Sequence, residues 1–208
     1  MALTKQARVL TEKQVRNASA RMSDYRYGKR NLAILQLTLL AGLRAKEVAS
    51  LRWRHLLDAE GGVGTAIRLT NEATKGRSGG VIPLNNALRE TLQGLLRAQG
   101  RVTGDDPVIR SATGGAMRRQ SVVNFLAAHY RRCDIEGASS HSGRRTFITN
   151  AARKISTVGG SMRDVMSLAR HANLQTTQRY IEANTEAQER VVQLVGQNAR
   201  KAVKIEKK

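Results

Sequence analysis

Apolar residues are spaced differently from one segment of the chain to the next, and most of the spacings predict helices. Residues 31–43 are apolar on nearly every face, which predicts a helix buried at the centre of the domain. Residues 12–22 follow the pair Thr11 and Gln14, which is typical of a capping box at a helix start. A polar connecting segment between these two helices is expected over 24–30. Further helices are predicted at 44–53, from a cap at Asn85 to about 98, and at 118–132, 142–155, 162–170, 174–188 and 186–199.

One segment in the first half of the chain has the periodicity of β-strands. Residues 65–69 alternate between apolar and polar positions, and residues 81–84 form a second short apolar run. The polar stretch 71–80 between them contains glycines and reads as the tip of a β-hairpin, which we expect to be mobile. The predicted fold is therefore mainly α with a small antiparallel β-hairpin, an α+β class.

The charge of the chain indicates a polyanionic partner. The 208 residues carry a formal net charge of +20, and such an excess usually marks nucleic acid binding. Aromatic residues make up only 3% of the chain, which argues against a single-strand platform of stacked rings. We therefore expect a nucleic acid as the partner.

The cysteine content and the apolar runs exclude several other classes of protein. A single cysteine, Cys133, rules out an internal disulfide and a cysteine-based zinc site, and it fits a reducing, cytoplasmic compartment. The N-terminus has no apolar signal core. The longest apolar run, 32–43, is too short for a membrane span, so no membrane partner is expected.

Two basic candidates lie in the first half of the chain. Arg44 and Glu47 are three residues apart, so on a helix the carboxylate can orient the guanidinium and leave donors for a phosphate. Because Arg44 follows the most apolar helix, we expect it to be drawn toward the interior. Lys75 in the hairpin tip can enter a DNA groove, and lysine can give up its proton. The ordinary alternatives are a surface ion pair and a solvated lysine.

The stretch 141–181 holds the other candidates. His141 and Arg144 are three residues apart in the first turn of a predicted helix, where anions are favoured, whereas Arg145 points to another face. His171 follows the end of a helix, and Tyr180 comes nine residues later. Taken singly, these residues also fit a capping histidine, a surface arginine, a second helix cap and a half-buried tyrosine.

Taken together and in this order, the candidates resemble the catalytic domain of the tyrosine recombinases, also called phage integrases. The resemblance runs from about Leu10 to Ile181 and rests on the segments AGLRAKEVASLRW, ATKGRSGGVIPL, HSGRRTF and LARHANLQTTQRYI. The family motifs are an arginine with an acid three residues later, a hairpin lysine, His-x-x-Arg, and a histidine or tryptophan nine residues before the nucleophilic tyrosine. Their counterparts in this chain are Arg44 with Glu47, Lys75, His141 with Arg144, His171 and Tyr180.

The resemblance implies a site-specific DNA recombinase, of integrase or invertase type, that cleaves and rejoins strands through a covalent 3′-phosphotyrosine at Tyr180. It also implies that no cofactor and no metal ion is needed, and Glu47 is the one acid assigned to the site. The implied roles are phosphate clamping by Arg44 and Arg144, a hydrogen bond from His171, general acid catalysis by Lys75 and proton transfer at the phenol by His141. The candidates for further DNA contacts are Arg77, Arg118, Arg119 and Arg145.

The chain departs from the family pattern in three places, one of which is the somewhat long segment RKISTVGGSMRD between Arg144 and His171. Arg170 stands where the family usually has a small residue before the histidine. About 30 residues precede the catalytic part, too few for the separate DNA-clamping domain of most members. The chain is thus similar to the short fimbrial phase-switch recombinases or to an excised catalytic domain. We expect a basic extension over 1–30, a catalytic domain over 31–185, and a C-terminal helix with a basic tail over 186–208.

Two other functions are compatible with the same residues: a type IB topoisomerase-like nicking-closing enzyme, and a non-catalytic DNA-binding regulator on this fold. For a recombinase, the resemblance implies a monomer in solution and a homo-tetramer on paired sites in double-stranded DNA. The C-terminal segment can dock on a neighbouring subunit or close its own core, through an apolar stripe of Val191, Leu194, Val195, Ala199 and Ala202.

Overall fold

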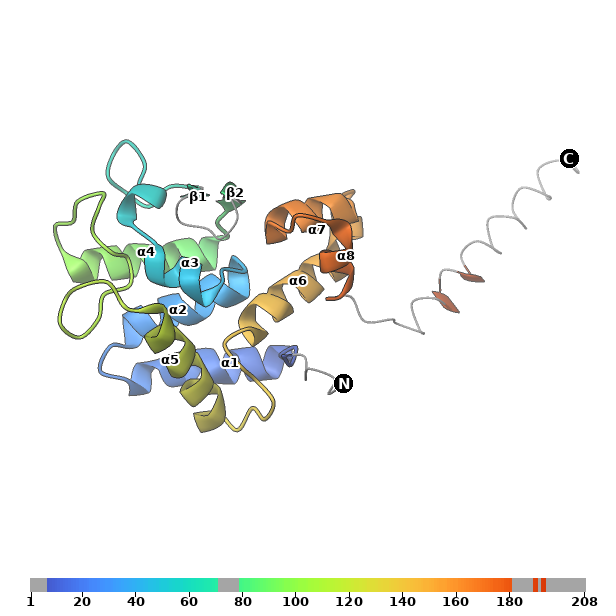
Figure 1. The fold of residues 1–208 in the computed structure, drawn as a ribbon, viewed down its shortest axis with the longest axis horizontal. Coiled ribbons are helices and arrows are strands. Elements are labelled where there is room, and N and C mark those ends of the chain that lie inside the picture. The colour runs from blue at the N-terminus through green and yellow to red at the C-terminus, as the bar shows by residue number, and fades with distance from the viewer. Residues whose placement is uncertain (1–6, 71–78, 181–188, 191, 194–208) are drawn as a thin grey trace, which may run out of the picture.

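The computed structural model describes residues 7–70, 79–180, 189–190 and 192–193, and this part of the chain is mainly helical (Figure 1). Two strands, β1 (Ala66–Leu69) and β2 (Gly80–Pro83), pair antiparallel with Ile67 opposite Ile82. The predicted α+β class with one small hairpin is confirmed. The helices are α1 (Glu12–Ala20), α2 (Gly28–Leu40), α3 (Ala45–Ser50), α4 (Asn86–Gln99), α5 (Arg119–Arg132), α6 (Ser142–Lys154), α7 (Met162–Ala169) and α8 (Leu174–Gln178).

Helix α2 lies at the centre of the main body, as its uniform apolarity predicts. It packs against α4 and α6, while the short α3 packs against α5. Residues of α1 and the turn after it belong to the same core as α2. The fully or almost fully buried side chains of this core include Leu10, Ala18, Met22, Ala33, Ile34, Leu35, Leu37, Val48 and Trp53.

A second, smaller core joins α6 to α7. Ile148, Val165 and Ala169 are buried in it, and Tyr180 packs against them from the chain after α8. In Figure 1, α7 and α8 lie to one side of the main body, and α6 connects them to it. The candidate residues are therefore divided between two packing units, with α6 between the units.

Two predicted helix starts are confirmed by their caps. The side chain of Thr11 accepts a hydrogen bond from the backbone of Gln14, whose own side chain accepts one from the backbone of Thr11. The side chain of Asn85 accepts a hydrogen bond of 2.9 Å from the backbone N–H of Leu88 at the start of α4. Each cap satisfies backbone donors that have no partner within the helix.

The start of α2 differs from the prediction, because the helix begins at Gly28 inside the expected polar connecting segment. A Cβ atom at Gly28 would lie 2.7 Å from the carbonyl oxygen of Met22, so the close turn before the helix requires glycine. Arg30 lies over the ring of Tyr27 at 4.4 Å and donates a hydrogen bond to the carbonyl of Arg110. These contacts stabilise a first turn that has no apolar periodicity.

Two predicted helices are shorter in the structure. Helix α3 ends at Ser50 instead of residue 53, because the backbone of Leu51 is extended. Helix α8 ends at Gln178, and residues 181–188 and the apolar C-terminal stripe lie outside the described residues. In the part of the chain that the structure describes, no helix has the length and apolar character that crossing a membrane requires.

Candidate active site

The first half of the candidate site is built at the start of α3. Arg44 precedes the helix, and its backbone N–H donates a hydrogen bond of 2.7 Å to Oε2 of Glu47. Its guanidinium donates a second bond of 3.0 Å to Oε1 of the same carboxylate. Glu47 therefore caps its own helix and orients Arg44, which confirms the predicted contact. Arg44 is drawn toward the interior only in part, since its side chain is 40% exposed while that of its partner Glu47 is 2% exposed.

Arg144 in the first turn of α6 is the more deeply buried arginine, at 3% exposure. Its guanidinium donates hydrogen bonds to the backbone carbonyls of Gly42 and Ala169, which join the end of α2 to the end of α7. The pKa of Arg144 is lowered to about 10, first by burial and then by the nearby cations Arg44 and Arg170. The side chain thus remains charged at neutral pH, and its charge lies between the two packing units.

Two glycines allow α6 to approach α2 closely enough for these bonds. Gly42 has a φ of +62°, and a Cβ atom there would lie 2.5 Å from the ring of Phe147. A Cβ atom at Gly143 would overlap Oγ1 of Thr38 in α2. Neither position can accept a larger residue without moving α6. The location of Arg144 therefore depends on this close helix contact.

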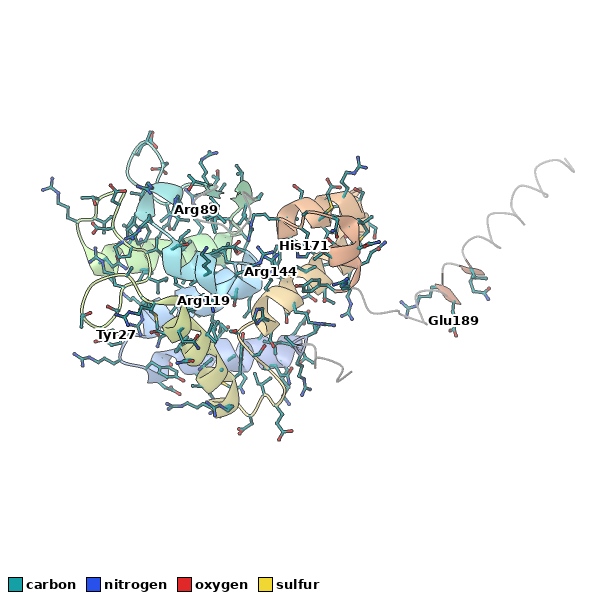
Figure 2. All side chains as sticks on the ribbon, viewed as in Figure 1. Tyr27, Arg89, Arg119, Arg144, His171 and Glu189 are labelled. Atoms are coloured by element: carbon teal, nitrogen blue, oxygen red, sulfur yellow. The ribbon has the colours of Figure 1, made fainter. Side chains whose placement is uncertain are left out.

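His171 lies directly after α7, close to Arg144 (Figure 2). Burial lowers the pKa of its imidazole to about 4, and the cations Arg144, Arg44 and Arg170 add to the shift. The ring is therefore neutral at pH 7 and carries one N–H. Its Nδ1 atom lies 3.0 Å from Oγ1 of the buried Thr177, a hydroxyl that can donate or accept. When Thr177 donates to Nδ1, the imidazole N–H is at Nε2.

Tyr180 is half-buried and stacks on His171, with the ring centres 5.3 Å apart. Its backbone carbonyl accepts a hydrogen bond of 2.9 Å from the hydroxyl of Thr149 in α6. Its phenol also raises the pKa of Arg144 by electrostatic attraction, so the two side chains interact. The structure thus brings Tyr180 together with His171 and Arg144, which are 9 and 36 residues away in the sequence.

Tyr180 also lines a pocket of about 440 Å³, together with His141, Arg145 and Arg179. His141 precedes α6 and is exposed, so it lies on the nucleophile side of the site, apart from the buried Arg144. Arg145 was expected on a different face from Arg144, and its guanidinium carbon lies 5.9 Å from the centre of the Tyr180 ring. Sequence spacing missed this contact, because α6 is buried on both of the faces in question.

The remaining predicted residues divide into two groups. Arg118 and Arg119 are exposed at the start of α5. Lys75 and Arg77 lie outside the described residues. Within the described residues, no group of three or more histidine, cysteine, aspartate or glutamate side chains is arranged to hold a metal ion.

Three residues at the site were not predicted to take part in it. Arg170 donates a hydrogen bond of 2.7 Å to Oε2 of Glu47, so three guanidinium groups surround a single carboxylate. Thr149 and Thr177 hold the backbone of Tyr180 and the ring of His171. Only Arg170 carried a sequence signal, as the charged residue in a place where the family usually has a small one. The threonines have no signal, because their partners are fixed by tertiary packing.

Solved structures that share this fold include recombinases and a transposon integrase. The crystal structure of XerA recombinase superposes with a TM-score of 0.71 over 93% of this chain and 65% of that chain, at 18% identity. The pre-cleavage complex of XerH site-specific recombinase bound to its difH substrate gives a TM-score of 0.67 over 92% of this chain and 55% of that chain, at 17% identity. At these identities the likeness establishes the fold.

Sequence comparison leads to the same family. Tyrosine recombinase XerC of Pelobacter propionicus is 30% identical over 155 residues, which are 74% of this chain and 48% of that protein. XerC of Myxococcus xanthus is 26% identical over 79% of this chain and 54% of that protein, so the chain spans about half the length of these relatives. Residues 8–187 match the Phage integrase family. The chain therefore belongs to the phage integrase family, whose members include the tyrosine recombinases.

Proposed function

We propose that this protein is a site-specific DNA recombinase that cleaves and rejoins strands through a covalent 3′-phosphotyrosine at Tyr180. One observation carries the proposal: a half-buried phenol stacks on a neutral imidazole beside a charged guanidinium that is buried between two packing units. This arrangement suits a phosphodiester, because the arginines attract its charge and the phenol can reach its phosphorus.

The proposed reaction exchanges one ester bond for another. The phenolic oxygen of Tyr180 attacks the phosphorus, the bond from phosphorus to the 5′-oxygen breaks, and the phenol proton passes to a base. The 5′-oxygen receives a proton and leaves as a hydroxyl. No water takes part, so the phosphate remains esterified to the tyrosine. A 5′-hydroxyl can then attack this ester in the reverse reaction, which releases the phenol and joins a DNA strand.

The arginines are proposed to stabilise the negative charge on the non-bridging oxygens of the phosphate. Arg44 is half-exposed and uses one guanidinium nitrogen for Glu47, so its outer donors face solvent. Arg144 is fixed by two carbonyls, and its remaining N–H groups are the ones that we assign to the phosphate. Both side chains stay charged at the pH of the reaction, which suits a transition state with spread negative charge.

The histidines and the lysine are proposed to handle hydrogen bonds and protons. His171 is neutral, so it would donate a hydrogen bond from Nε2 without adding a charge. His141 shares a pocket with Tyr180 and would accept the phenol proton. Lys75 is proposed to protonate the leaving 5′-oxygen, on the resemblance alone.

The proposed substrate is double-stranded DNA, and strand exchange would occur in a homo-tetramer on two paired sites. The net charge of +20 supports DNA as the partner. The structure of XerH bound to its difH substrate supports the same use of this fold. The exposed Arg118 and Arg119 are candidate phosphate ligands, and replacing either one with a neutral residue would make the affinity for DNA less dependent on salt.

A denaturing gel tests the proposal. The wild-type protein is incubated with nicked DNA fragments from the flanks of its gene, and we expect a protein–DNA species that survives SDS. Tyr180→Phe should bind the same fragments with similar affinity and give no such species. An adduct that persists in Tyr180→Phe would exclude Tyr180 as the nucleophile. Relaxation of supercoiled plasmid without exchange between two sites would favour the topoisomerase-like alternative.

A further inference from the structure

Arg170 ends α7 in a conformation that glycine adopts more easily. Its φ is 52° and its ψ is 49°, which is the left-handed region, and the residue is 8% exposed. Among the described residues with a side chain, only Asp134 shares a positive φ. A Cβ atom disfavours this conformation, so a helix end needs no arginine here. The side chain must therefore contribute something that glycine lacks.

That side chain reaches from α7 to the start of α3. Its Nη2 atom lies 2.7 Å from Oε2 of Glu47, and the two side chains are 4% and 2% exposed. The same carboxylate holds Arg44 through its backbone N–H and its guanidinium. Arg170 is therefore joined to Arg44 through one buried carboxylate, although the two residues belong to different packing units.

The stem of Arg170 also lies against the β-hairpin. A Cβ atom at Gly80, the first residue of β2, would be 3.5 Å from Cδ and 3.7 Å from Cγ of Arg170. The next residue after Arg170 is His171, whose backbone N–H donates a bond of 3.1 Å to the carbonyl of Met166. A single residue thus contacts α3 and β2 and adjoins the histidine.

We propose that Arg170 is a positioning residue that fixes His171 relative to Arg44 through Glu47. This inference rests on the proposed function and concerns how the same site is held together. A guanidinium suits the task because a buried carboxylate needs more than one donor and a partner of opposite charge, and Arg170 adds one donor to the two from Arg44. Glycine at this position would satisfy the backbone but leave the two halves of the site unconnected.

A double-mutant cycle on stability tests the link without any catalysis. Unfolding in urea is compared for the wild type, Arg170→Gln, Glu47→Gln and the double variant. For independent residues, the change in the unfolding equilibrium constant of the double variant equals the product of the two single changes. We expect it to differ from that product by at least about tenfold, as for residues in one ion-pair network. Additive effects would overturn the inference, whether or not the protein cleaves DNA.

The rate of DNA cleavage then distinguishes a positioning role of Arg170 from an effect of its backbone conformation or of the net charge. We expect Arg170→Gly to remove the strain of the left-handed backbone conformation. The variant should nevertheless form the Tyr180 adduct about a hundredfold more slowly, while its affinity for DNA changes by less than about threefold. Arg170→Lys should recover part of the rate because it keeps the charge. Arg163→Gln removes an exposed charge from α7 and should stay within about twofold of the wild type.

The outcomes distinguish this inference from the proposed function. Arg170→Gly that cleaves as fast as the wild type would reduce Arg170 to a helix end and overturn the inference. A wild-type protein that forms no adduct on any fragment, with intact coupling between Arg170 and Glu47, would instead contradict the proposed function. If Arg170→Gly melts below the assay temperature, Arg170→Gln decides, since a rate equal to the wild type would show that the ion pair with Glu47 is not needed and would overturn the inference.

Discussion

The two packing units that meet at the site differ in how firmly they hold their residues. Arg44 and Glu47 stand on the main body, whose core contains 28 buried residues in the described part of the chain. His171 and Tyr180 stand on a core with three, and the hydrogen bonds with Thr177 and Thr149 hold them in place. Small cores open at lower free energy than large ones. The difference indicates a firmly placed phosphate clamp and a nucleophile whose position depends on few contacts.

Removing Arg144 should have the largest effect, because this residue contacts both units. We expect Arg144→Ala to slow formation of the Tyr180 adduct by roughly 10²–10³-fold, the usual effect of losing one preorganised donor to a transition state. Single-turnover cleavage measures the rate. The matched control is Arg119→Ala, which removes an exposed charge and should mainly weaken DNA binding in a salt-dependent way. Equal losses of rate in both variants would contradict a special role for Arg144.

Gly143→Ala should weaken the junction itself. The added methyl group meets Thr38, so α6 must move away from α2 and carry Arg144 away from Gly42. We expect a loss of about 1–3 kcal/mol in the free energy of unfolding, as for overpacked contacts, together with slower cleavage. The control is Gly94→Ala in α4, where no atom lies within 4 Å of the added Cβ.

The control should shift stability in the opposite direction. Alanine in place of a glycine inside a helix usually stabilises by about 0.5–1 kcal/mol, because the unfolded chain loses freedom. Urea unfolding measures both variants. If Gly143→Ala is as stable as the wild type, the close contact between α2 and α6 does not position Arg144.

His171 should make the smaller unit sensitive to acid, and this is the smallest effect that we expect. Its pKa is about 4 when folded and near 6.5 in an ordinary environment, so the unfolded chain binds the proton first. Stability should therefore be unaffected above about pH 6.5 and fall as the pH drops toward 4. Between pH 7.5 and pH 5, the melting temperature should drop by a few degrees more in the wild type than in His171→Gln. Equal drops would show that His171 is not held in its neutral form.

Much of the fold could be predicted because local rules decide it. The caps at Thr11 and Asn85 and the alternation in β1 depend on neighbours in the sequence, and the structure has them where expected. The start of α2 could not be predicted, since its first turn depends on Tyr27, on the distant carbonyl of Arg110 and on a close approach at Gly28. Tertiary contacts decide such ends.

Helical spacing predicted one contact of the candidate site and missed others. The contact between Arg44 and Glu47 follows from helical spacing, and the structure contains it. The exposure of Arg44 and the approach of Arg145 to Tyr180 depend on tertiary packing, which the spacing of residues in the sequence does not determine. Arg170 was visible only as a departure from a family pattern, and its bond to Glu47 spans 123 residues.

The measurement that tests the central claim most directly is the identity of the residue that becomes attached to DNA. Wild-type protein is trapped on a nicked fragment, digested with nuclease and protease, and sequenced by mass spectrometry. The account predicts a phosphodiester linked to Tyr180, with the 5′-end of the cut strand free as a hydroxyl. A linkage to Tyr25, Tyr27, Tyr130 or any serine, or a 5′-phosphate at the cut, would contradict it.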